Sequence, residues 1–95
     1  MLDKKQKIEL KKLGHKLDPV IHIGKEKLSP SAVSNILREL ANHELIKIKV
    51  NDNAMASPKE LIKELEVLTQ GEVIQTIGKM LLLYKENKED PKLII

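Results

Sequence analysis

The residues with the clearest chemical potential form a short basic loop, Gly24-Lys25-Glu26-Lys27. The loop follows an apolar run and precedes Ser29-Pro30, a pair typical of a helix start. Helix N-termini present free N–H groups and a partial positive charge, and neighbouring lysines add charges that a phosphate can use. Glycine also lets a ligand approach the backbone closely. The pattern predicts a phosphate-binding loop, although an ordinary connection with two solvated lysines fits the same residues.

Further basic residues gather near the start of the chain. Between Met1 and Lys27, eight lysines stand against four acids, whereas the whole chain carries a net charge of only +3. This asymmetry favours a polyanionic partner, and the alternative is a solvated lysine-rich helix. We expect the N-terminal lysines and the loop to form one surface. The candidate binding residues are Gly24, Lys25 and Lys27 of the loop, Lys4, Lys5 and Lys12 before it, and His22, Lys47 and Lys49 on predicted strands.

Catalysis and metal binding are not expected from these residues. The chain has no cysteine, and its three histidines lack the spacing of metal ligands. No nucleophile elbow or Walker-type loop is visible. Tyr84 is the only aromatic residue, which argues against recognition by stacking bases on aromatic side chains. We predict a protein that is not an enzyme and needs neither a cofactor nor a small-molecule substrate.

Length and composition indicate one small domain. Ninety-five residues with 41% hydrophobic content suffice for a single core. The charged first 20 residues do not resemble a signal peptide, and no apolar run approaches the roughly 18 residues of a membrane span. We expect a cytoplasmic monomer that does not interact with membranes.

Hydrophobic periodicity and capping signals predict three helices. The first covers Asp3–Leu17, with its leucines on one face and its lysines on the remaining arc. The second begins after Ser29 and ends near Asn42-His43. The third begins after Ser57, whose Ser-Pro-Lys-Glu stretch matches a capping box, and closes with Gly71 as its left-handed residue.

Four strands complete the predicted α/β (α+β) fold. Crossover geometry favours parallel pairing of the first two strands, and Gly78-Lys79 predicts a hairpin between the last two. The last strand does not alternate in polarity, so it should be interior and covered on both faces. The expected product is a single domain over residues 1–86 with a mixed four-stranded sheet and three helices. A charged tail, 87–95, is either loose or docked through its apolar end. The strands are Val20–Ile23, Leu45–Val50, Val73–Ile77 and Met80–Tyr84, with a loop at 51–56.

Three stretches resemble the CRM domain, a family of RNA-binding domains found in chloroplast splicing factors and as a stand-alone bacterial ribosome-maturation protein. They are Pro19 to Leu28, His43 to Val50 and Ile77 to Lys85, and the resemblance spans residues 2–85 in order. The His-Glu-Leu-Ile-Lys stretch that begins at His43 is the most specific part. Length and a single copy resemble the bacterial form.

The resemblance implies a fold similar to the C-terminal domain of translation initiation factor three. It also implies RNA binding and association with the precursor of the large ribosomal subunit. The family's Gly-x-x-Gly loop corresponds to Gly24 to Lys27, so Lys27 stands where the family has its second glycine. The family's basic first helix carries over to Lys4, Lys5 and Lys12.

We therefore predict an RNA-binding protein that acts in large-subunit assembly and contacts ribosomal RNA. Two alternatives remain open at this point. One is a small architectural nucleic-acid-binding protein, and the other is a protein-interaction module whose lysines serve only solubility.

Overall fold

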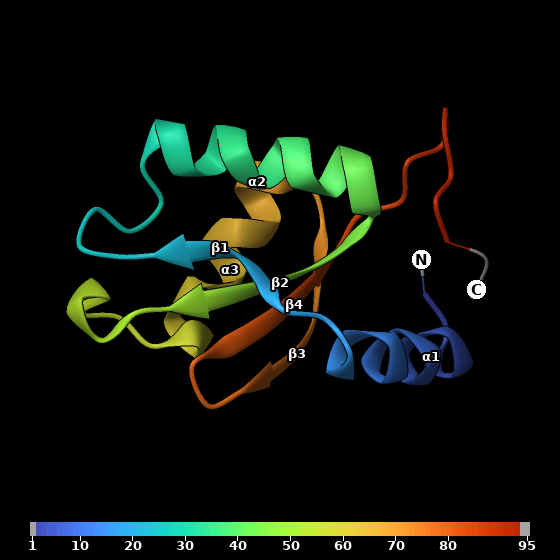
Figure 1. The fold of residues 1–95 in the computed structure, drawn as a ribbon, viewed down its shortest axis with the longest axis horizontal. Helices are drawn as coiled ribbons and strands as arrows, with labels where there is room; N and C mark the ends of the chain where they lie inside the picture. The colour runs from blue at the N-terminus through green and yellow to red at the C-terminus, as the bar shows by residue number, and fades with distance from the viewer. Residues whose placement is uncertain (1, 94–95) are drawn as a thin grey trace.

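A computed structural model describes residues 2–93 of the chain. The predicted order of helices and strands is confirmed (Figure 1), and the expected loop at 51–56 contains one short 3-10 turn, η1. The elements are α1 (Lys4–His15), β1 (Pro19–Ile23), α2 (Pro30–His43), β2 (Leu45–Val50), η1 (Asp52–Ala54), α3 (Pro58–Thr69), β3 (Glu72–Ile77) and β4 (Met80–Tyr84).

The sheet is mixed and has the strand order β1-β2-β4-β3. β1 lies parallel to β2, as the crossover through α2 requires, and the remaining pairs are antiparallel. β4 therefore lies between β2 and β3, in the interior position that its continuous apolar run predicts.

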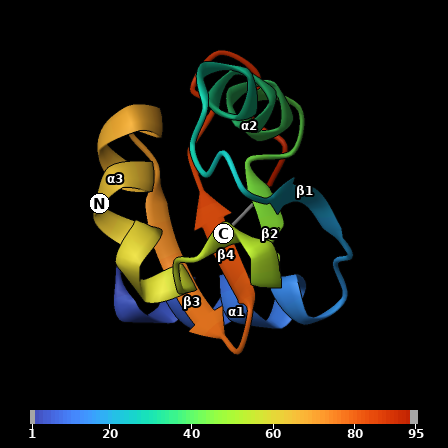
Figure 2. The same cartoon turned by 90° about the vertical axis from the view of Figure 1, so that its left-hand side faces the viewer.

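Helices cover both faces of the sheet (Figures 1 and 2). α2 and α3 lie on one face, and α1 lies on the other. β4 serves both cores, since Leu81 and Leu83 join the cluster under α2 and α3, whereas Leu82 and Tyr84 join the cluster under α1. This division explains why the run Met80 to Tyr84 does not alternate in polarity.

The helix starts agree with the capping signals, but two helix ends differ. α1 ends at His15 rather than at the predicted Leu17. Asp3 and Ser57 form capping boxes, and Ser29 caps α2. At the end of α3 the left-handed residue is Gln70, with φ 62°, rather than the predicted Gly71. Gly71 has another reason to be glycine. A Cβ there would lie 2.9 Å from the carbonyl oxygen of Tyr84.

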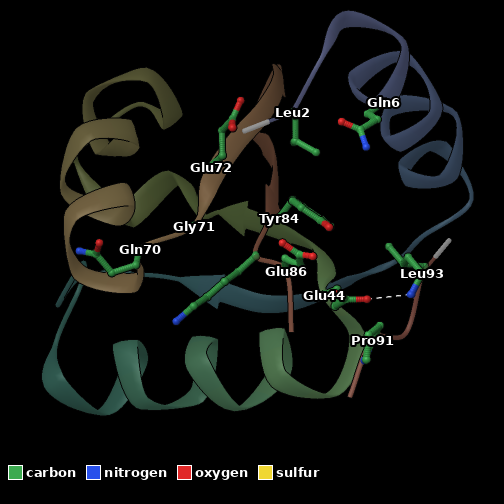
Figure 3. Close-up of a pocket in the computed structure, with 11 residues that line it drawn as sticks. Leu2, Gln6, Glu44, Gln70, Gly71, Glu72, Tyr84, Glu86, Pro91 and Leu93 are labelled. Carbon is green, nitrogen blue, oxygen red and sulfur yellow. Dashed lines mark hydrogen bonds between the residues drawn. The ribbon is translucent and has the colours of Figure 1, made fainter. Parts of the chain in front are cut away.

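The described part of the C-terminal tail folds back onto the domain. Leu93 packs against the cluster under α1. The carboxylate of Glu44, the residue that follows α2, accepts hydrogen bonds from the backbone N–H groups of Asn87, Lys92 and Leu93 at 2.7, 2.5 and 2.7 Å. Figure 3 shows the bond to Leu93 at the edge of a pocket of about 580 Å³. The rest of the predicted apolar end, residues 94–95, lies outside the described residues.

Candidate nucleic-acid interface

α1 presents its exposed lysines in stripes that follow from helical spacing. Leu10 and Gly14 face the sheet, and an added Cβ on Gly14 would lie 2.3 Å from Leu82, so the helix sits tightly against β4. Lys5, Lys12 and Lys16 are all exposed and are separated by seven and four residues. Residues with these separations share one side of a helix. They therefore form a single row that ends at the C-terminal end of α1.

The row of lysines on α1 leads to the sheet at Lys47. Lys16 and Lys47 line the same groove beside the C-terminal end of α1. On β2, Ile46, Ile48 and Val50 are buried under α2 and α3. Because strand side chains alternate, the half-buried Lys47 and Lys49 point to the face that carries α1.

His22 extends this basic face to the neighbouring strand. It is exposed and pairs in register with Lys49, while Ile21 and Ile23 on either side of it are buried under α2. His22 therefore lies on the same sheet face as Lys47 and Lys49. Sequence patterning thus placed all three residues on strands, and the structure places them together.

The Gly24–Lys27 loop lies at the carboxyl ends of β1 and β2. It forms a tight turn in which the Lys27 N–H donates to the Gly24 carbonyl oxygen at 2.9 Å. Lys27 has φ 53°, so it adopts the left-handed conformation that favours glycine. Gly24 does not have a positive φ, and an added Cβ would meet only the Asn53 side chain, at 3.4 Å. Lys25 and Lys27 are exposed.

α1 and the Gly24–Lys27 loop lie toward opposite ends of the sheet rather than side by side (Figures 1 and 2). The basic residues of β2 and β1 lie between them, on the face that carries α1. We call the whole set the basic track. It consists of Lys5, Lys12 and Lys16 on α1, Lys47 and Lys49 on β2, His22 on β1, and Gly24, Lys25 and Lys27 in the loop.

Some lysines lie outside the basic track. Lys4 is exposed in the first turn of α1, on a different row from Lys12. Lys7 forms an ion pair with Glu72 of β3 at 3.1 Å, and Lys79 pairs with Asp52 of η1 at 3.6 Å. Lys16 was not among the predicted site residues, yet it connects α1 to β2. Its spacing of four residues from Lys12 is the signal in the sequence that could have identified it.

Within residues 2–93, no group of three or more His, Asp or Glu side chains is arranged to hold a metal ion. Among the helices of the same range, none has the length and apolar character needed to cross a bilayer.

Comparison with known proteins gives consistent matches along the whole chain. The CRS1/YhbY (CRM) domain matches residues 2–85. A probable RNA-binding protein of Pseudomonas aeruginosa is 33% identical over 91 residues, which cover 96% of this chain and 88% of that protein. The probable RNA-binding protein YqeI of Bacillus subtilis is 32% identical, with 98% and 97% covered. A hypothetical protein of Staphylococcus aureus, solved in solution, superposes with a TM-score of 0.73 at 39% identity, covering 99% of this chain and all of that one.

Proposed function

This chain is a member of the CRS1/YhbY (CRM) domain family, and from that premise we propose that it binds RNA through the basic track. The single observation that carries the proposal is the placement of Lys47, Lys49 and His22 on the sheet face between the lysines of α1 and the Gly24–Lys27 loop. A strand of RNA that crosses this face would meet lysines of α1, of β2 and of the loop in turn. The relatives named as RNA-binding proteins support the same conclusion.

The track suits recognition of backbone and shape more than of sequence. Its charged side chains are lysines, which contact phosphates as charges, and it contains no Phe, Tyr or Trp. The loop adds an exposed turn whose Gly24 has no side chain to block a phosphate. In its finer form, the proposal is that the protein acts as a cytoplasmic monomer. Its partner is the ribosomal RNA of the large-subunit precursor during assembly, and it performs no catalysis.

The binding surface is tested by reversing charges on the track. Changing Lys12, Lys16, Lys25 and Lys27 to glutamate should weaken binding of structured ribosomal RNA by about 100-fold or more, and it should flatten the dependence of affinity on salt. Lys59 and Lys63 on α3 are exposed on the opposite side of the sheet, so K59E/K63E serves as the control. Equal affinity of both variants in filter binding would reject the track.

The partner is tested separately. Competition between structured ribosomal RNA and duplex DNA distinguishes an RNA-binding protein from a general architectural one. An RNA-binding protein should prefer the ribosomal RNA, whereas a general architectural protein should bind the two competitors about equally. Sedimentation of a lysate should place the protein with large-subunit precursors, and nuclease treatment should release it. A complex that survives nuclease would indicate a protein partner.

A further inference from the structure

An apolar groove of about 470 Å³ lies beside the basic track. It is bounded by the C-terminal end of α1, the first residues of β1 and β2, and the tail. Its apolar lining comes from six residues: Leu13, Leu17, Val20, Leu45, Ile46 and Leu93. The volume falls within the roughly 300–1,000 Å³ typical of sites for small ligands.

Two lysines lie at the edge of the groove. Lys16 and Lys47 line it together with His43, and Asp18 is the one acidic residue in its lining. Lys16 and Lys47 also belong to the basic track, so the groove opens directly onto the surface that we propose for RNA. An apolar pocket with cations at its edge matches a ligand that has a flat, weakly polar body and a negatively charged group attached.

The shape of the groove is set before any ligand arrives. Leu93 is held in place because the Glu44 carboxylate accepts a hydrogen bond from its backbone N–H at 2.7 Å. Leu45 is 4% exposed and belongs to the core. Val20, in contrast, is 44% exposed on an edge strand. The groove therefore combines fixed walls with one apolar side chain that the core leaves available.

We propose that this groove holds one unstacked nucleobase of the RNA strand whose phosphates follow the basic track. The inference rests on the proposed RNA-binding function. Aliphatic side chains can cover the two faces of an extruded base, and Lys16 and Lys47 can pair with the phosphates on either side of it. His43 and Asp18 offer polar groups to the edge of the base. An apolar side chain of a protein partner would make no use of the two lysines.

The test compares two probes of equal length and charge. One is an oligoadenylate of about 12 nucleotides, and the other is a ribose-phosphate oligomer of the same length that lacks bases. Methyl NMR spectra of the protein should show shifts of Leu13, Leu17 and Val20 with the oligoadenylate, together with contacts from these methyl groups to base protons. The oligomer without bases should shift the residues of the track but leave these methyl groups unchanged.

A conservative substitution then measures the contribution of the groove. Val20→Ser should reduce the preference for oligoadenylate over the base-free oligomer by about fivefold, because it removes apolar surface from the wall. Val67→Ser is the matched control, since Val67 is 66% exposed on α3, on the opposite side of the sheet. This control should leave the preference unchanged.

The outcomes separate this inference from the proposed function. If both oligomers bind equally and the groove methyls do not respond, the nucleobase site is wrong while RNA binding by the track stands. If neither oligomer binds, the nucleobase site is wrong, and the proposed function is decided by the assay with structured ribosomal RNA. A variant chain truncated after Leu93 tests whether residues 94–95, rather than a nucleobase, occupy the groove. If that truncation by itself shifts the groove methyls, and these methyls respond to oligoadenylate only in the truncated chain, residues 94–95 are the occupant in the full chain and the inference is overturned.

Discussion

Glu44 accepts a hydrogen bond from the backbone N–H of Leu93, 49 residues further along the chain, at 2.7 Å. Glu44 is only 1% exposed, yet its carboxylate is satisfied by this N–H and by those of Asn87 and Lys92. It also adopts φ 62°, a conformation that costs free energy for a residue with a side chain. A buried acid in a strained conformation is tolerated because it ties the tail to the end of α2.

Replacing Glu44 with glutamine should destabilise the domain by about 2–4 kcal/mol. Glutamine offers one acceptor oxygen, and its amide group would face backbone donors that need an acceptor. Urea denaturation would measure the loss, and Glu89→Gln on the exposed part of the tail is the control, expected within about 0.5 kcal/mol of the wild type. An unfolding free energy equal to that of the wild type would mean that the tail contributes nothing to stability.

Stability should also fall at acidic pH because of the same group. Burial by itself would raise the pKa of Glu44, but the N–H donors of Asn87, Lys92 and Leu93 and the charge of Lys92 outweigh it and lower the pKa below its usual value. A lowered folded-state pKa means that the contribution is fully present above the unfolded value of about 4.3 and is lost as the pH falls through the folded value. Urea midpoints measured from neutral pH downward should decline less steeply for Glu44→Gln than for the wild type.

Gly14 and Gly24 should respond in opposite ways to alanine. A Cβ on Gly14 would lie 2.3 Å from the buried Leu82 side chain, so Gly14→Ala forces α1 away from β4. Overpacking of this kind costs about 1–3 kcal/mol, which exceeds the gain of about 1 kcal/mol in helix propensity. A Cβ on Gly24 would meet the Asn53 side chain at 3.4 Å, and Gly24 needs no positive φ.

Thermal unfolding should therefore show a lower midpoint for Gly14→Ala and an unchanged or slightly higher one for Gly24→Ala. Any loss of RNA affinity in Gly24→Ala can then be attributed to the loop surface rather than to unfolding. A large loss of stability in Gly24→Ala would contradict the contact at 3.4 Å as the structure places it.

Local signals in the sequence were sufficient to predict most of the fold. Asp3, Ser29 and Ser57 cap their helices as their residue types indicate, because a cap depends on neighbours three residues away. The interior position of β4 followed from its unbroken apolar run. The end of α3 was less predictable, because both Gln70 and Gly71 can end a helix, and the close approach of Tyr84 to Gly71 is not a local signal.

The candidate site was harder to predict for a different reason. Charge counts identify lysines but not their positions, so the sequence could not show that α1 and the Gly24–Lys27 loop lie toward opposite ends of the sheet. The linking role of Lys16 depends on a groove shared with Lys47, which is 31 residues away. The tail was likewise ambiguous, because the donors that satisfy Glu44 are 43 to 49 residues from it.

Lys27 allows the charge of the loop to be separated from its backbone conformation. Its φ of 53° should cost about 1 kcal/mol relative to glycine, so Lys27→Gly should unfold at higher urea concentration than Lys27→Ala, although both remove the same charge. If Lys27 contacts RNA through its charge, the two variants should lose affinity equally, and each should lower the salt dependence by about one ion. A glycine variant that binds better than the alanine variant would instead show that RNA approaches the backbone here. In that case the residue that occupies the second glycine position of the family limits the contact rather than replacing it.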